Sequence, residues 1–250
     1  MFKYIVKRSL WVIPTMLGVL VVLFSLTYFL PGDPASIMLG PRATPELVEE
    51  LNQRLQLDKP LAVRLLYYLK GVVQGDLGTS VWSGRTVASL IADALPHTII
   101  LAMTSLGFAA LIGIIMGAYS AIKSHSPMGG AVTIMALLGV ALPDYVAALL
   151  LMLLFCVKWP LFPALGAGEP GHYLDMASHL ALPAMALAIS WIGYLARLTQ
   201  ESMVQVLETD YIRTARAFAV PSSVISYRYA LKNAIIPTIT VIGLGVGKLL

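Results

Sequence analysis

Residues 98–122 read TIILAMTSLGFAALIGIIMGAYSAI and contain no charged side chain. A helix that crosses the hydrocarbon core of a bilayer needs about 20 apolar residues, so this run is long enough to cross one. Lipid offers the backbone no hydrogen-bond partners, which favours a helix because its backbone bonds close within the segment. The run therefore predicts a transmembrane helix, in which Gly113 and Gly117 favour close packing against a neighbouring helix.

Four other runs share this character. Of the 250 residues, 58% are hydrophobic and 12% are charged, whereas an average soluble domain carries about 25% charged residues. We therefore expect an all-α fold, a polytopic transmembrane helical bundle, with kinks at Pro143 and Pro183. The predicted transmembrane helices cover residues 1–32, 97–122, 129–157, 177–200 and a segment from about Ile235 that is still apolar at Leu250.

The chain is expected to have three parts: an N-terminal anchor helix (1–32), an external segment (33–95) and a core transmembrane domain (96–250). The first apolar run is longer than that of a cleaved signal peptide, and no A-x-A site follows it, so we expect the anchor to be retained.

The external segment is predicted to contain short amphipathic helices. Thr44 is expected to cap a helix that Pro45 opens, although Leu47 occupies the position where a complete capping box has Glu or Gln. Residues 61–73, LAVRLLYYLKGVV, form a second amphipathic pattern.

Basic side chains are concentrated on the loops that share a side with the N-terminus. Lys3, Lys7, Arg8 and Lys123 lie there, together with the basic segment 205–234, whereas the opposite loops carry more acids. Cytoplasmic loops of membrane proteins carry the excess of Lys and Arg. We therefore expect a multi-pass membrane protein, in contact with lipid, with a cytoplasmic N-terminus. The net charge of +4 follows from this topology and gives no nucleic-acid-binding signature.

No motif for enzyme chemistry is found. The C-terminal GLGVGKLL looks like a phosphate-binding loop, but Ile242 stands where its first glycine belongs and Leu249 replaces the Mg-binding Ser or Thr. Cys156 is the single cysteine, and the four histidines lack metal-ligand spacing. We expect no catalytic residue, no metal site and no cofactor on this chain.

Asp144 interrupts the third apolar run. An ionisable residue within a membrane span is a candidate functional residue. Because Pro143 precedes it and frees backbone groups, two interpretations stay open: Asp144 satisfies the backbone at a kink, or it lines a watery pathway. Asp144 is our pathway candidate. A secondary transporter driven by an ion gradient would also need such a residue, but we find no convincing internal repeat.

Residues 210–219, DYIRTARAFA, predict a short amphipathic helix on the cytoplasmic side, which the Val220-Pro221 pair ends. Thr209 or Asp210 is expected to cap it. An apolar ridge rimmed by arginines is typical of a helix that docks in a protein groove; the alternative is a helix lying on anionic lipid. The small apolar face and the lack of lysines favour a protein partner. The predicted face consists of Tyr211, Thr214, Ala215 and Phe218.

Several motifs make the whole chain resemble the inner-membrane permease subunits of ABC importers for peptides and nickel, the B-type permeases of dipeptide and oligopeptide systems. They are PGDP (31–34), GDLGTS (75–80), the segment around DYIRTARAFAVP (210–221) and RYALKNAIIPT (228–238). The resemblance implies a location in the bacterial inner membrane and the type I importer permease fold with six spans, so we expect this sequence to stop within the fifth.

The family motif E-A-A-x-x-x-G aligns with Arg213, Thr214, Ala215 and Ala219, so alanine replaces the motif glycine. Alanine costs on the order of 1 kcal/mol if the left-handed turn is kept. Either the turn differs, or Pro221 terminates the helix.

The resemblance also implies a mechanism in which this chain is no enzyme. It would form a pathway with a second permease, two ATPase subunits carrying ATP and Mg would bind below, and an external solute-binding protein would deliver the substrate. Di- and oligopeptides, nickel, glutathione and related solutes are the implied substrates. The implied ATPase-coupling contact comprises Asp210, Tyr211, Arg213, Thr214, Ala215, Arg216, Phe218 and Ala219.

Overall fold

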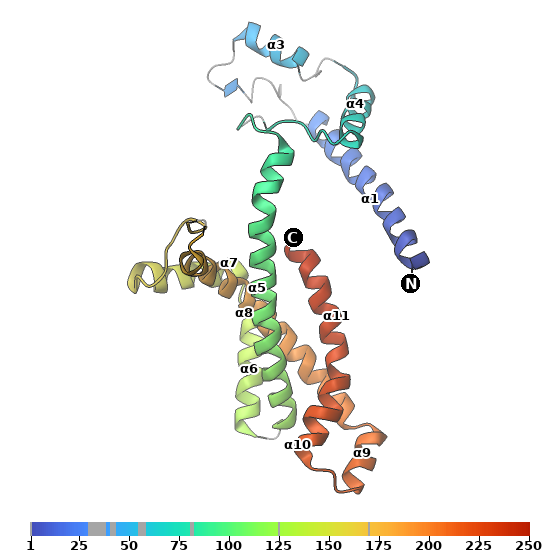
Figure 1. The fold of residues 1–250 in the computed structure, drawn as a ribbon, viewed down its shortest axis with the longest axis vertical. Coiled ribbons are helices and arrows are strands. Elements are labelled where there is room, and N and C mark those ends of the chain that lie inside the picture. The colour runs from blue at the N-terminus through green and yellow to red at the C-terminus, as the bar shows by residue number, and fades with distance from the viewer. Residues whose placement is uncertain are drawn as a thin grey trace. The chain divides into compact units, whose positions relative to one another are not determined.

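The computed structural model divides into two compact units, residues 1–93 and 94–250. Apart from an isolated antiparallel bridge between Thr79 and Thr86, the described residues form no β-structure, so the all-α expectation is confirmed (Figure 1). The residues that the structure describes are 2–29, 39–40, 44–54, 59–80, 83–124, 126–169 and 171–250.

The first unit contains α1 (Phe2–Phe29), α3 (Pro45–Arg54) and α4 (Leu61–Val73), with α1 in contact with α4. Thr44 caps α3 as expected: the Leu47 N–H donates to Thr44 Oγ1 at 3.4 Å. The PGDP stretch, residues 31–34, lies outside the described residues.

The GDLGTS stretch that follows α4 forms a compact turn. Asp76 Oδ1 accepts a hydrogen bond from the Gly78 N–H at 2.8 Å, and the Ser80 N–H donates to the Arg85 carbonyl at 2.8 Å. Gly78 has a φ of 83°, a left-handed conformation that glycine adopts without a Cβ clash. This turn leads the chain into α5 (Val87–Ile122), within which the boundary between the two units falls.

The second unit contains the rest of α5 and all later elements. They are α6 (Pro127–Ala141), α7 (Asp144–Met152), the π-helix η2 (Leu153–Lys158), α8 (Tyr173–Leu207), α9 (Asp210–Ala217), α10 (Ser222–Val224), the π-helix η3 (Ile225–Ala230) and α11 (Leu231–Leu249). Helices α6, α7 and α11 all pack against α8, which is therefore the centre of this unit (Figure 1).

Four stretches of helix in the described chain are long and apolar enough to cross a membrane: one within α1, then α5, α8 and the α10–η3–α11 stretch. The expected span 129–157 instead consists of α6 and the α7–η2 pair, joined at a bend of 98°. Pro143 lies at this break, so the proline produces a broken span rather than a local kink. Helix α8, in contrast, continues through Pro183.

Small residues let α5 and α6 approach α8 closely. A Cβ on Gly117 would lie 2.7 Å from the Thr199 Cβ, and one on Gly113 would lie 3.0 Å from the Leu195 Cβ. On α8, a Cβ on Gly193 would meet the α6 backbone. The predicted role of Gly113 and Gly117 in close packing is therefore confirmed.

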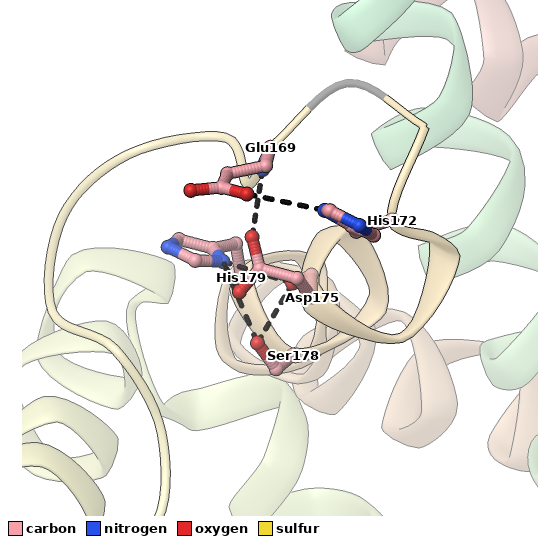
Figure 2. Close-up of polar contacts among 5 residues, drawn as sticks. All are labelled: Glu169, His172, Asp175, Ser178 and His179. Carbon is pink, nitrogen blue, oxygen red and sulfur yellow. Dashed lines mark hydrogen bonds and ion pairs between the residues drawn. The ribbon is translucent and has the colours of Figure 1, made fainter.

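A polar cluster holds the loop between η2 and α8 against the start of α8 (Figure 2). Asp175 Oδ2 accepts the Glu169 N–H at 2.7 Å, while the Asp175 carbonyl accepts from the Ser178 hydroxyl at 2.7 Å. His179 Nδ1 lies 2.9 Å from the same carbonyl, and His172 Nδ1 lies 3.1 Å from Glu169 Oε2. The two histidines thus bond to carbonyl and carboxylate groups of their own loop and helix.

Candidate functional site

Helix α9 begins directly after α8 ends. Thr209 occupies the capping position, but its hydroxyl donates backward to the Val206 carbonyl at 2.6 Å and does not cap α9. Asp210 lies in the first turn, where a carboxylate interacts favourably with the helix dipole, and it accepts from Arg213 Nη1 at 3.2 Å. Both side chains of this pair are largely exposed, so it adds little stability.

The inner face of α9 consists of Ile212, which is 0% exposed, and Ala215, which is 9% exposed. They pack into an apolar cluster formed by the ends of four other elements: Ala118 and Ala121 of α5, Met203 of α8, Ile225 and Ala230 of η3, and Ala234 of α11. An isolated helix of eight residues is not stable in water, so this burial holds α9 in place.

The outer face of α9 carries aromatic and basic side chains. Phe218 is 80% exposed and Tyr211 is 44% exposed, and Arg213 and Arg216 are exposed beside them. Thr214 is exposed too, and its hydroxyl donates to the Asp210 carbonyl at 2.9 Å. A large exposed aromatic ring with arginines around it is the composition of a protein interaction surface.

The predicted face of α9 differs from the observed one at Ala215. We expected Ala215 to share an outer face with Tyr211 and Phe218, whereas it lies inside with Ile212. The i, i+3 spacing of Ile212 and Ala215 in the sequence contains this signal, because Ile212 is the only branched aliphatic residue of α9 and needs a buried position.

The end of α9 keeps the left-handed turn despite its alanine. Ala219 has a φ of 54°. The Val220 N–H donates to the Ala215 carbonyl at 3.1 Å, and the Ala219 N–H donates to the Arg216 carbonyl at 3.0 Å, which together form a Schellman motif. Val220 also packs on the apolar cluster beneath α9. The alternative in which the turn differs is therefore wrong: Ala219 adopts the left-handed conformation in spite of its Cβ.

A hydrogen bond joins α9 to the start of α11. Asn233 Nδ2 donates to the Tyr211 hydroxyl at 2.9 Å and to the Tyr229 carbonyl at 3.3 Å. Asn233 was not among the residues predicted from the sequence, because a contact across 22 positions has no local pattern.

Asp144 is remote from α9 and forms the first turn of α7. Ser190 Oγ of α8 donates to Asp144 Oδ1 at 2.5 Å. Asp144 therefore lies at the break in the third span and also lines a cavity beside α8. Among the described residues the carboxylate accepts from Ser190 and from no backbone group, so its role at the kink or in a pathway stays a prediction.

Several membrane-crossing helices and a short exposed helix between two of them define a polytopic helical membrane protein. Within the described part of the chain, no group of three or more His, Cys, Asp or Glu side chains is arranged to hold a metal ion.

Comparison with known proteins gives the family. Residues 109–250 match the family described as binding-protein-dependent transport system inner membrane component, and residues 1–102 match the N-terminal component of the same systems. The glutathione transport system permease protein GsiC of Salmonella choleraesuis is 38% identical over 251 residues, which cover 100% of this chain and 79% of the relative. The dipeptide transport system permease protein DppB of Alkalihalophilus pseudofirmus is 35% identical over 271 residues, which cover 100% of this chain and 81% of that relative.

The chain belongs to the family of inner membrane components of binding-protein-dependent transport systems. It is a multi-pass permease subunit of an ABC importer.

Proposed function

We propose that this chain forms, with a second permease subunit, the membrane pathway of an importer for small peptidic solutes. The similarity to glutathione and dipeptide permeases supports this substrate class. An external solute-binding protein delivers the solute, and two ATPase subunits bind on the cytoplasmic side. ATP and Mg are bound and ATP is hydrolysed on those subunits. The excess of basic residues on the loops beside the N-terminus supports a cytoplasmic N-terminus and a cytoplasmic α9.

The proposed contact with an ATPase subunit is the outer face of α9 with the turn that follows it. The observation that carries the proposal is that α9 and its C-terminal capping residue have a buried and an exposed side: Ile212 is fully buried, whereas the capping residue Phe218 is 80% exposed. The exposed ring suits an apolar groove, and Arg213 and Arg216 beside it suit acidic groups at the groove's rim.

The way α9 is held explains how such a contact would act on the membrane spans. The inner face of α9 packs on the ends of α5, α8 and α11, and Tyr211 accepts a hydrogen bond from Asn233 of α11. A displacement of α9 is therefore transmitted to three spanning helices together. ATP binding can shift the permease between two conformations only if the ATP-bound ATPase subunits bind one conformation more tightly than the other. The contact at α9 is where that difference in binding free energy would arise.

The test is a substitution that changes the outer face without changing the fold. In the assembled transporter reconstituted in liposomes, Phe218→Glu should lower dipeptide uptake per ATP hydrolysed, because a carboxylate cannot be buried in an apolar groove without a partner. The matched control is Leu165→Glu in the loop before α8, since Leu165 is 87% exposed and belongs to the opposite side of the proposed topology.

Ala215 is not a suitable position for this test. It is buried within the chain, so a bulky residue there would displace α9 and lower uptake whatever α9 binds. Normal uptake and normal co-purification of the ATPase subunits with the Phe218→Glu chain would contradict the proposed contact.

A further inference from the structure

A cavity of about 390 Å³ lies between α7, α8 and α11 and contains both signs of charge. Asp144 of α7 and Lys248 of α11 line it, together with Ser190, Trp191 and Tyr194 of α8. Ligand cavities in proteins commonly have volumes of about 300–1,000 Å³, so a dipeptide or tripeptide is of a suitable size.

In the proposed topology, the lengths of α6 and α11 put the two charged groups at membrane depth. Helix α6 has 15 residues and rises about 22 Å before the break that precedes Asp144. Helix α11 has 19 residues and is about 28 Å long, with Lys248 in its last turn. Both helices begin at the end of the second unit where α5 turns into α6 and α8 turns into α9. Measured from that end, both charges fall within the hydrocarbon thickness of about 30 Å.

Charged side chains at this depth rarely face lipid, because the cost of removing them from water is high. Asp144 and Lys248 are both exposed on the surface of this chain, yet they open on one cavity. By this rule, the face that carries them is directed toward the interior of the assembled protein and away from lipid.

The arrangement keeps the two charges apart and available. No ion pair joins Asp144 to Lys248 in the part of the chain that the structure describes. Asp144 is oriented by the Ser190 hydroxyl, and the Lys248 ammonium lies 5.6 Å from the centre of the Trp191 ring. Tyr194 packs edge-on against Trp191, with ring centres 6.1 Å apart, so the wall beside the two charges is aromatic.

We propose that this cavity is a binding site for the transported solute on its way through the membrane and that it is selective for zwitterions. A free ammonium group binds at Asp144, a free carboxylate binds at Lys248, and the chain between them lies along Trp191 and Tyr194. A peptide with free termini has this pattern of charges. The inference deepens the proposed function, on which its assignment to peptides rests.

The site is tested on the complete transporter in lipid nanodiscs, without the binding protein. The permease is labelled with 5-fluorotryptophan, and the Trp191 fluorine resonance is assigned by its loss in Trp191→Phe. Three probes are titrated: alanyl-alanine, its N-acetyl derivative and its C-terminal amide. In the unsubstituted chain, the N-acetyl group and the C-terminal amide should each weaken binding about tenfold, because each removes one charge-assisted hydrogen bond.

Substitutions of the two charged residues show whether they bind solute or only stabilise the fold. Asp144→Asn should weaken alanyl-alanine about tenfold and remove the difference between free and N-acetylated probes. Lys248→Met should remove the difference between free and amidated probes and leave the effect of acetylation. Glu201→Gln, an exposed carboxylate on α8 outside this cavity, is the matched control and should change none of the three affinities.

Equal weakening of all three probes by both variants, or no change with either, would overturn the inference. Peptide uptake by the unsubstituted transporter in liposomes, with binding protein and ATP, is measured in parallel. If uptake is normal and the probe pattern is absent, the inference alone fails. If no peptide is taken up although the probe pattern is present, the proposed peptide import fails and the zwitterion site stands.

Discussion

The left-handed conformation of Ala219 leads to a prediction. Replacing Ala219 with glycine should stabilise the end of α9, whereas replacing Ala217 with glycine should destabilise it. Ala219 has a φ of 54° in the turn that closes α9, whereas Ala217 is the last residue of the helix. Both are exposed, so replacing either with glycine removes no buried contact. The two substitutions therefore differ mainly in the backbone conformation that glycine must adopt.

The expected magnitudes follow from that backbone. A left-handed conformation costs a residue with a Cβ about 1–2 kcal/mol, and glycine avoids this cost but loses about 0.5–1 kcal/mol in additional chain entropy. Ala219→Gly should therefore stabilise the closed turn by about 1 kcal/mol, which is about fivefold in the opening equilibrium. Ala217→Gly should destabilise the helix end by about 0.5–1 kcal/mol.

The assay is hydrogen–deuterium exchange of the segment 208–221 in the assembled transporter, because amide exchange measures local opening. Exchange of the amides at the end of α9 should slow in Ala219→Gly and accelerate in Ala217→Gly. The Val220 amide, which donates to the Ala215 carbonyl, is the most direct reporter. Acceleration in both variants would refute the argument, since it would mean that Ala219 does not keep the left-handed turn and that Pro221 alone ends the helix.

Three further predictions concern contacts within the chain. Gly117→Ala should lower the thermal stability of the purified transporter, because the new Cβ would lie 2.7 Å from the Thr199 Cβ and overpacking costs about 1–3 kcal/mol. The control is Gly107→Ala, whose Cβ would meet no atom within 4 Å, so the thermal stability should stay the same or rise. Ile212→Ala should cost about 2–4 kcal/mol at the base of α9, accelerate exchange throughout α9 and lower uptake per ATP; unchanged exchange would contradict the anchoring role. Asp175→Ala should increase proteolytic cleavage of the loop 159–172, because it removes the acceptor of a 2.7 Å hydrogen bond from the loop backbone.

The spans were predictable because a segment that crosses lipid must be long and apolar and must satisfy its backbone hydrogen bonds within itself. Long uncharged runs indicated helices, and α5, α8 and the α10–η3–α11 stretch lie where those runs are. The helix limits were less predictable: α5 begins at Val87, before the apolar run. Hydropathy reports the part of a helix that lipid surrounds, whereas backbone hydrogen bonding continues beyond it.

The candidate site was predictable as a segment but not in its orientation. The pattern of 210–219 indicated a short amphipathic helix, yet its buried face is set by Met203, Ile225 and Ala234, which are contributed by other parts of the chain. Asp144 was recognisable as an ionisable residue in a span. Its relation to Ser190 and Lys248 was not, because only the folded chain brings α7, α8 and α11 together.

The six-residue π-helical turn η3 sets the rotation of the helix that follows it, α11. It connects α10 to α11 in one helical stretch, and a π-turn holds one residue more than the corresponding α-helical turn. Loss of that residue would rotate everything after it by about 100° about the helix axis. Gly245 would then turn away from Trp191, and Lys248 would leave the aromatic wall. The count of residues in a single wide turn therefore decides which side of α11 faces the cavity at Trp191 and which side faces the surroundings.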